Sequence, residues 1–241
     1  MRLTVLGSNG TYATPGRPTS GYLVTNADTR IWLDAGTGTF CALLDLVSPA
    51  ELDAVIISHA HPDHSADLFA LYHWLRFSPG AGSRLALFVP EGLAERFEAF
   101  LTGPLEEVFD VRIPAPVEEV GSFTVRFARA DHSVPTLQVR FDAAGDSLAY
   151  SADTGLECDL VELASDVDLL LSEATYQGND KDFAQHLTAR EAGGIAARAG
   201  AARLVLTHLV PTLEAGQTIS EAAEVFSGEI LVATPGLEVE V

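Results

Sequence analysis

A dense cluster of histidines directly follows an apolar segment in the first third of the chain. Residues 54–57 read AVII, and the next stretch, SHAHPDHSADL, contains His59, His61, Asp63 and His64. One such histidine could cap a helix or hydrogen-bond in a core, but imidazoles crowded together repel one another when protonated. Neutral imidazole nitrogen and carboxylate oxygen are ordinary ligands for zinc and similar ions. The spacing therefore predicts a metal site at the end of a buried strand.

Three further apolar segments lead to a residue that can bind metal. His132 follows FTVRFAR, Asp153 follows SLAYS, and His208 follows RLVL. Functional side chains of sheet-based folds gather at the carboxyl ends of strands, where loops carry them on a rigid scaffold. Four such endings in one chain indicate that these residues meet at a common site.

Short apolar strands alternate with turns rich in Gly, Pro and Asp, and amphipathic helices lie between them. We expect strands at 2–6, 21–25, 30–34, 53–58, 85–89, 123–129, 137–141, 147–151, 167–172, 203–207 and 230–233. We expect helices at 39–47, 65–77, 91–102, 156–165, 187–199 and 218–226. The early strands suggest a meander and the later ones alternate with helices, which predicts an α/β fold of two mixed sheets with helices outside.

The charge balance disfavours several function classes. Of the 241 residues, 34 are acidic and 14 are basic, giving a formal net charge of −20. An acidic surface repels long polyanions and anionic membranes, and the sequence contains no basic run of the kind that grips nucleic acid. A small anionic substrate held at a dicationic metal centre stays compatible with this charge, because the ions set the local field.

The sequence also bears on compartment. No apolar segment is long enough to span a bilayer, and MRLTVLGSNG lacks the features of a signal peptide. Cys41 and Cys158 could form at most one disulfide, and neither lies in a metal-binding spacing. We expect both cysteines to be buried small hydrophobic residues, and the protein to be cytoplasmic.

Taken together, these motifs resemble the metallo-β-lactamase fold superfamily. HAHPDH matches the HxHxDH motif, and LDAG at 33–36 resembles the early aspartate motif. The resemblance spans nearly the whole chain. It implies one domain, residues 1–241, folded as an αββα four-layer sandwich of two mixed β-sheets flanked by helices, with a dinuclear metal site where the sheets meet. One metal would be held by His59, His61 and His132, the second by Asp63, His64 and His208, and Asp153 would bridge the two.

Departures from sister groups favour zinc. Relatives that hydrolyse lactams often use a cysteine ligand, and neither cysteine here is placed for that role. Diiron relatives typically carry glutamate at the position of His61. We therefore expect two divalent metal ions, with Zn²⁺ favoured, although Mn²⁺ and Fe²⁺ accept the same donors. Asp34 is expected to hydrogen-bond to a ligand histidine from outside the ligand set.

A second resemblance points to the ribonuclease Z branch of phosphodiesterases. LLSEATY at 170–176 and HLTAREAG at 186–193 look like the paired motifs of that branch. The resemblance implies that His186 contacts the scissile phosphate and protonates the leaving oxygen, and that Asp63 is a general base as well as a ligand. Alternatively, His186 could cap the helix that follows it. Glu173 and Tyr176 are candidates for residues near the site, whereas His73 fits a structural role on a packed helix better than a substrate contact.

The interval between His132 and Asp153 separates this chain from tRNA-processing relatives. Those enzymes insert there an arm that clamps tRNA, but here the two residues are only 21 positions apart. We therefore expect a small phosphodiester substrate, with a cyclic nucleotide the best candidate, because the opening at 6–24 also resembles compact bacterial cyclic-nucleotide phosphodiesterases. The alternatives are an RNA-processing nuclease, a glyoxalase II-type thioester hydrolase and a non-catalytic metal-binding scaffold. Members of this branch often form homodimers.

Overall fold

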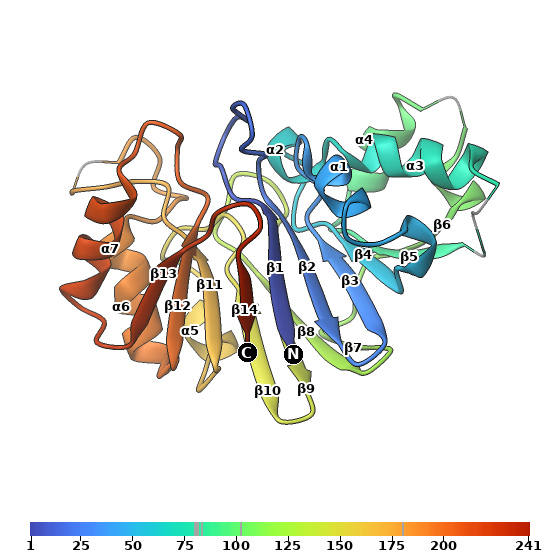
Figure 1. The fold of residues 1–241 in the computed structure, drawn as a ribbon. Helices are drawn as coiled ribbons and strands as arrows, with labels where there is room; N and C mark the ends of the chain where they lie inside the picture. The colour runs from blue at the N-terminus through green and yellow to red at the C-terminus, as the bar shows by residue number, and fades with distance from the viewer. Residues whose placement is uncertain (80–81, 83, 102, 180) are drawn as a thin grey trace.

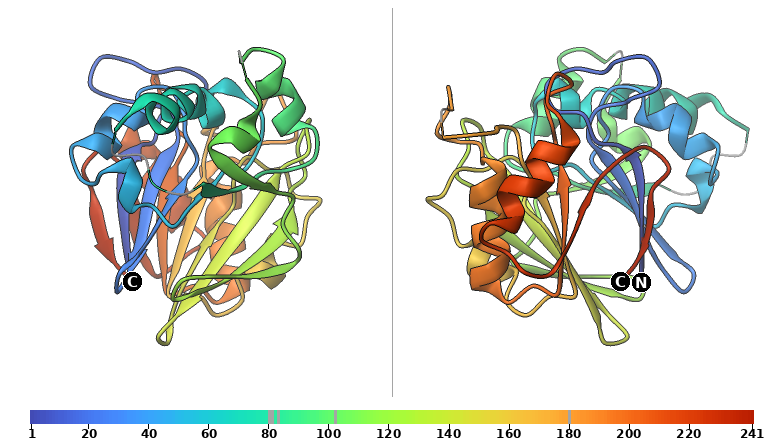
Figure 2. Two further views of the ribbon diagram at one scale, coloured as in Figure 1. Left: turned by 90° about the vertical axis from the view of Figure 1, so that its right-hand side faces the viewer. Right: turned by 60° about the vertical axis from the view of Figure 1, so that its left-hand side comes forward.

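Two β-sheets face each other, and helices cover the outer face of each sheet (Figures 1 and 2). The computed structural model describes residues 1–79, 82, 84–101, 103–179 and 181–241. This arrangement confirms the predicted αββα sandwich. Within the described residues, no helix is both long enough and apolar enough to cross a membrane.

The first sheet has the strand order β14-β1-β2-β3-β4-β5-β6. Its strands are β1 (Arg2–Gly7), β2 (Gly21–Asn26), β3 (Thr29–Leu33), β4 (Ala54–Ile56), β5 (Leu85–Phe88), β6 (Phe109–Arg112) and β14 (Glu238–Glu240). From β14 to β3 neighbouring strands are antiparallel, and from β3 to β6 they are parallel. Parallel neighbours require crossover connections, which is why helices α1 (Thr39–Leu44), α3 (Leu68–Phe77) and α4 (Leu93–Glu98) accompany this half.

The second sheet repeats this plan with the order β13-β12-β11-β10-β9-β8-β7. Its strands are β7 (Val117–Val120), β8 (Phe123–Arg129), β9 (Leu137–Ala143), β10 (Asp146–Tyr150), β11 (Leu169–Glu173), β12 (Arg203–Thr207) and β13 (Glu229–Val232). Strands β7 to β10 form an antiparallel meander, and β10 to β13 are parallel. In both sheets the parallel half presents its carboxyl ends toward the same end of the molecule.

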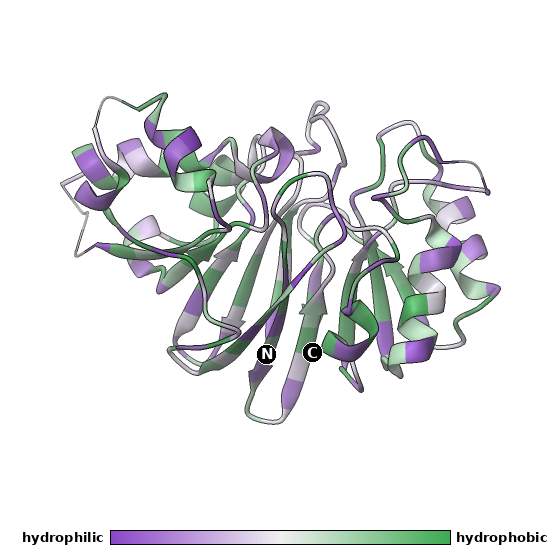
Figure 3. Cartoon of the chain, turned by 180° about the vertical axis from the view of Figure 1, so that it is seen from behind, coloured by the Kyte–Doolittle hydropathy of each residue, from purple (hydrophilic) through white to green (hydrophobic). Residues whose placement is uncertain are grey.

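Three apolar clusters hold the four layers together. The central cluster lies between the sheets and includes Leu3, Ile31 and Phe141. A second packs the outer face of the first sheet against α1 (Thr39–Leu44), α3 (Leu68–Phe77) and α4 (Leu93–Glu98), and a third packs the second sheet against α5 (Leu160–Leu163), α6 (Ala189–Ala199) and α7 (Ala215–Ala223). Figure 3 shows the apolar strands between these outer layers. Strands buried on both faces explain the continuous apolar runs in the sequence.

Several predicted boundaries were wrong. Strands β6, β7 and β14 were not expected, because they are short and carry charged residues. The helix predicted at 65–77 begins only at Leu68, as α3, and the short helix α2 (Pro62–Ser65) that precedes it was not expected. The helix predicted from 187 begins at Ala189, because Thr188 forms a capping box with Glu191. His186 is therefore not the cap of α6.

Cys41 does not have the buried position that we expected. Helix α1 turns Thr39, Phe40 and Leu43 toward the sheet, so Cys41 is exposed on the opposite side. Cys158 is half-buried, and both thiols are free. The error has a simple reason: a helix that covers the outer face of a sheet buries only one side, and Cys41 lies on the other.

Candidate metal centre

The predicted ligands come together at the carboxyl ends of strands from both sheets. His59 follows β4, and α2 begins immediately after His61 and carries Asp63 and His64. On the opposite sheet, the ligands follow strand ends. His132 follows β8, Asp153 follows β10, and His208 follows β12.

The first donor group contains the three predicted histidines. His59 Nε2 lies 3.0 Å from His61 Nδ1, and His132 Nε2 lies 3.2 Å from the same His61 atom. Asp153 Oδ2 is 3.6 Å from His59 Nε2 and 4.0 Å from His132 Nε2. Donors bound 2.0–2.1 Å from a tetrahedral zinc lie about 3.3 Å apart. The spacing of this group therefore fits a single ion.

The second donor group faces the other oxygen of Asp153. Asp153 Oδ1 lies 3.3 Å from His64 Nε2 and 3.4 Å from His208 Nε2. Asp63 Oδ2 lies 3.2 Å from His208 Nε2 and 3.9 Å from His64 Nε2. One carboxylate thus presents a separate oxygen to each group, as a carboxylate bridging two cations would.

Hydrogen bonds at the far side of the rings point nitrogen lone pairs into the centre. His64 Nδ1 is 2.8 Å from Asp34 Oδ2, and His132 Nδ1 is 3.1 Å from the Gln185 carbonyl oxygen. Neither of these acceptors can donate, so each ring carries its proton on Nδ1 and leaves Nε2 free to bind metal. Asp34 therefore hydrogen-bonds to His64, one of the predicted ligands.

His59 and His208 are held in the same way through hydroxyl groups. Ser58 Oγ donates to Asp34 Oδ2 at 2.8 Å and lies 3.0 Å from His59 Nδ1, so it accepts from that ring. Thr175 Oγ1 donates to Glu173 Oε2 at 2.6 Å and accepts from His208 Nδ1 at 2.8 Å. Each hydroxyl therefore links a candidate ligand to a buried carboxylate by two hydrogen bonds.

Two atoms of the centre are left without a protein partner. His64 Nε2 and Asp153 Oδ1 are buried and have no hydrogen bond within the described residues. An unsatisfied buried acceptor is costly, and facing lone pairs cannot satisfy one another. A cation between them would satisfy both, so the residues present fit a metal pair.

Most protonation preferences agree with this arrangement. The exception is His64: burial acts to lower its pKa, but the charges of Asp153 and Asp34 outweigh burial and raise it. Burial and the nearby His64 lower the pKa of His59, and burial lowers the pKa values of His61 and His132. These rings therefore favour the neutral form, which is the form that can bind a metal. Burial acts to raise the pKa of Asp63, but the hydrogen bond and charge of His208 outweigh it, and the pKa is lowered. Asp63 is thus an ionised carboxylate.

His186 lies beside the two donor groups, and with Asp153 and His208 it forms a third set of residues close enough to hold an ion, its Nδ1 being 4.0 Å from Asp153 Oδ2. Its Nδ1 is 3.1 Å from Glu173 Oε1, and its ring stacks parallel to that of His208, with centroids 5.6 Å apart. Burial opposes protonation of His186, but the hydrogen bond and charge of Glu173 outweigh it and raise the pKa. The buried Glu173 also accepts from the backbone N–H groups of Thr154 and Leu187, which fixes its position.

Two residues named from the sequence differ in their distance from the site, and two residues that contact the site were not predicted. Tyr176 contacts His186, with ring centroids 6.2 Å apart. His73 is exposed on α3, and its ring hydrogen-bonds to the Phe69 carbonyl oxygen one turn earlier in the same helix. Sequence reasoning missed the amide of Thr11, which donates to Asp63 Oδ2 at 2.8 Å, and Tyr150, whose hydroxyl donates to Asp34 at 2.8 Å. A backbone amide leaves no residue-type signal, and Tyr150 reads as an ordinary strand residue.

Unusual backbone conformations gather around the centre. Thr11, Asp34, Ala152 and His208 all have positive φ, between 49° and 67°. This region is disfavoured for residues with a side chain, and such strain persists where the surrounding structure enforces it. The turns at the ends of these strands are therefore held in the geometry that aims the ligands inward.

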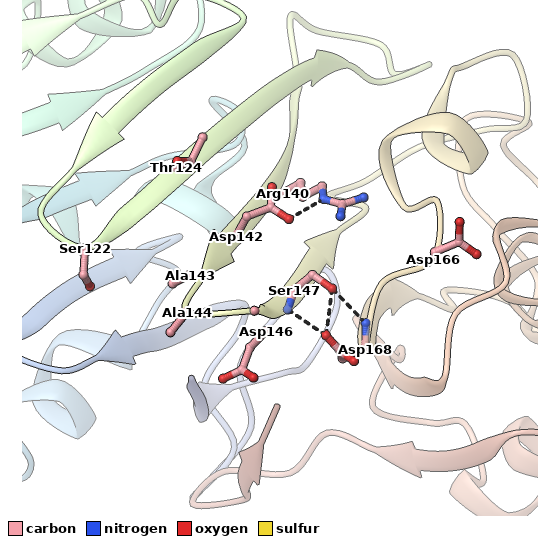
Figure 4. Close-up of a pocket in the computed structure, with 11 residues that line it drawn as sticks. Ser122, Thr124, Arg140, Asp142, Ala143, Ala144, Asp146, Ser147, Asp166 and Asp168 are labelled. Atoms are coloured by element: carbon pink, nitrogen blue, oxygen red, sulfur yellow. Dashed lines mark hydrogen bonds and ion pairs between the residues drawn. The ribbon is translucent and has the colours of Figure 1, made fainter.

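A cavity of about 560 Å³ lies elsewhere, beside the β9–β10 turn (Figure 4). Asp146 begins β10 and Asp153 follows its other end, so this cavity and the metal centre lie at opposite ends of the strand. Two of the four aspartates that line it have a cationic partner, because Asp142 pairs with Arg140 and Asp146 pairs with the N-terminal ammonium. The donor groups described above have no counterpart there among the described residues.

Comparisons with known proteins agree with this site. Residues 29–209 match the beta-lactamase superfamily domain. Probable metallo-hydrolase YhfI of Bacillus subtilis is 31% identical over 98% of each chain, and its crystal structure superposes with a TM-score of 0.91, covering 100% of this chain and 99% of YhfI.

Two other relatives match over most of their length. The uncharacterized protein Rv1339 of Mycobacterium tuberculosis is 37% identical over 95% of this chain and 88% of its own. Ribonuclease Z of Mycobacterium bovis is 30% identical over 276 aligned positions, which cover 100% of this chain and 98% of that enzyme. The family match and these relatives lead to one conclusion: the chain belongs to the beta-lactamase superfamily.

Proposed function

We propose that the protein is a dinuclear metal-dependent phosphodiesterase that hydrolyses a small nucleotide phosphodiester, with a 3′,5′-cyclic nucleotide as the best candidate. The observation that carries the proposal is the pair of donor groups that share Asp153, one on each carboxylate oxygen. Two closely spaced divalent ions suit in-line displacement at phosphorus. The likeness to a metallo-hydrolase and to a ribonuclease supports the same class of reaction.

Seven side chains would hold the two metal ions. His59, His61 and His132 would hold one ion, Asp63, His64 and His208 the other, and Asp153 both. When bound, such ions lower the pKa of a water molecule and withdraw charge from a phosphate oxygen. Zinc suits the nitrogen-rich donor set, and manganese or iron would accept the same atoms.

Asp63 and His186 would move the protons. Asp63 Oδ2 faces the centre while Thr11 donates to it, so the carboxylate is fixed where it can orient the attacking water and accept its proton. His186, whose protonated form is favoured by the hydrogen bond and charge of Glu173, would contact the phosphate and donate a proton to the leaving oxygen. Glu173 acts by orienting His186.

The segment between His132 and Asp153 supports a small substrate. Strands β9 and β10 and their two-residue turn occupy most of it, and both are paired within the second sheet. This leaves no arm that could clamp a large nucleic acid. The 276-position alignment exceeds the 241 residues of this chain, so the ribonuclease has additional residues that are missing here. An RNA-processing nuclease is the second candidate because of that whole-length likeness.

The direct test is hydrolysis of 3′,5′-cyclic AMP by protein reconstituted with zinc, and with manganese in parallel. We expect two bound metals per chain and measurable turnover. Asp63→Ala should reduce kcat by about 100-fold or more, because it removes a proton acceptor as well as a ligand. Metal content should be measured for each variant, so that loss of a metal is distinguished from loss of the base.

Asp28→Ala is the matched control, since Asp28 is an exposed carboxylate in the β2–β3 turn, distant from the strand ends that carry the ligands. It should retain full activity. Absence of turnover on cyclic and linear dinucleotide substrates, with two metals bound, would overturn the proposal. Cleavage of RNA but not of small phosphodiesters would favour the nuclease.

A further inference from the structure

The loop between β1 and β2 contacts the metal centre directly. This loop, residues 8–20, rises from the carboxyl end of β1 beyond the edge of the sheet (Figure 1). The Thr11 amide donates to Asp63 Oδ2 at 2.8 Å, and the Gly10 amide donates to the Leu209 carbonyl at 3.0 Å. A side chain at Gly10 would lie only 2.8 Å from His208 Nδ1. The loop is therefore seated against two candidate ligands of the second metal.

The same loop is stiffened from within. The buried Asn9 side chain donates to Thr14 Oγ1 and to the Arg17 carbonyl, both at 3.2 Å. Thr14 and Arg17 also exchange two backbone hydrogen bonds of 3.0 and 2.8 Å. Thr11 holds a φ of 67°, which is rare for a β-branched residue. These contacts fix the direction in which the next residue, Tyr12, leaves the loop.

The aromatic side chain of Tyr12 is available to contact a ligand. It is 47% exposed, and within the described part of the chain neither its ring nor its hydroxyl has a stacking or hydrogen-bond partner. Consecutive Cα atoms are 3.8 Å apart, so the Tyr12 Cα lies within about 8 Å of Asp63 Oδ2. A tyrosine ring therefore stands one side-chain length from the metal centre on a rigid support.

We propose that Tyr12 stacks on the nucleobase of the bound substrate and so makes this enzyme prefer nucleotides over other phosphodiesters. The inference rests on the proposed function for the class of substrate. The metals, Asp63 and His186 would address only the phosphate, which carries no information about the group attached to it. A neutral aromatic ring suits the π-face of every base and adds no charge to the acidic chain. Base–aromatic stacking contributes roughly 1–3 kcal/mol per base, which corresponds to about 5- to 150-fold in affinity.

The test compares the binding of adenosine 5′-monophosphate and ribose 5-phosphate, which differ only in the base, by equilibrium dialysis against metal-loaded protein. The wild type should bind the nucleotide about tenfold or more tightly than the sugar phosphate. Tyr12→Ala should abolish that preference without weakening the binding of ribose 5-phosphate, and Tyr12→Phe should retain it. Phe100→Ala is the matched control, because Phe100 is 81% exposed but packs on Phe69 in the outer helical layer.

The outcomes separate this inference from the proposed function. A base preference that survives in Tyr12→Ala, or a wild type that binds both ligands equally, overturns the role of Tyr12. Base-dependent binding that vanishes in Tyr12→Ala, in a protein that cleaves no phosphodiester, supports the role of Tyr12 and rejects the activity. Turnover of a cyclic nucleotide with no base preference rejects only the role of Tyr12.

Discussion

His186 is the residue whose proposed role can be isolated most cleanly. It contacts His208 and Glu173 and lies outside the two ligand groups assigned to the metals, although it could also bind an ion together with Asp153 and His208, which is why metal content must be measured in its variants. If it protonates the leaving oxygen, its importance depends on how badly that oxygen needs a proton. His186→Ala should lower kcat/KM by about 100- to 10,000-fold for an unactivated nucleotide diester. The loss should be far smaller for a p-nitrophenyl phosphodiester, whose leaving group departs without protonation.

The measurement is the ratio of the two losses in steady-state kinetics, with metal content checked in the variant. Equal losses on both substrates would contradict a general acid and indicate a binding or structural role. His73→Ala provides the control, because His73 is exposed on α3 and lies outside the centre. It should leave both rates unchanged.

The candidate metal ligands were easier to predict from the sequence than the residues that hold them in place. The candidate ligands could be recognised because histidine and aspartate cluster in HAHPDH and recur after apolar strands. Ser58 and Tyr150 could not, since each acts only through its contact with Asp34. Tyr150 and Asp34 are 116 positions apart and meet only because the two sheets face each other. Partners of this kind depend on tertiary placement, which residue type does not encode.

Among the elements, α6 shows how tightly the outer layer is packed. Gly193 and Gly194 are adjacent in the helix interior, but their surroundings differ. A Cβ at Gly193 would lie 2.7 Å from the Ala222 carbonyl oxygen of α7, whereas a Cβ at Gly194 meets nothing within 4 Å. The close approach of α6 to α7 therefore requires a glycine at only one of these positions.

The adjacent pair gives an internally controlled prediction. Gly194→Ala should raise the free energy of unfolding by about 0.5–1 kcal/mol, because alanine restricts the unfolded helix segment more than glycine does. Gly193→Ala gives the same gain in helix propensity, but its Cβ would push α6 away from α7. We therefore expect the free energy of unfolding to fall by about 1–3 kcal/mol. Urea denaturation of the two variants and the wild type would decide. Equal effects of the two substitutions would contradict close packing of α6 on α7.

Element boundaries were the weakest part of the sequence interpretation, for a physical reason. The strands of the parallel halves are apolar throughout and were found, whereas β7 reads VEEV and β14 reads EVE. These edge strands are held in the sheet by backbone hydrogen bonds to the one strand beside them. Charged side chains on edge strands also hinder unwanted pairing between molecules, which makes such strands resemble loops in sequence.

Across the whole molecule, the metal centre depends on both sheets. Each donor group combines residues that follow β4 with residues from the second sheet, and Asp153 from the second sheet serves both groups. The centre therefore exists only when the two sheets have packed together. The two mixed sheets could be predicted from the pattern of strands and helices, and the four-layer sandwich from the resemblance of the motifs to a known fold superfamily. The four strand endings predicted only that the candidate ligands meet at a common edge.

The net charge of −20 leads to a prediction about substrate length. A long RNA brings many phosphates near an acidic surface, whereas a dinucleotide brings few. Repulsion should slow capture of the polymer at 0.1 M salt, where the Debye length is about 10 Å, and should fade at 1 M, where it is about 3 Å. We therefore expect kcat/KM for a 20-nucleotide RNA to rise with salt relative to that for a dinucleotide measured under the same conditions.

The opposite slope would identify an RNA-binding enzyme. Proteins that grip nucleic acid through lysine and arginine release counterions, so their affinity falls steeply as salt increases. The dinucleotide corrects for any effect of salt on the metal centre itself, because both substrates react there. A relative rate for RNA that falls with salt would mean that a local basic surface overrides the acidic whole, and the nuclease candidate would replace the small-nucleotide phosphodiesterase.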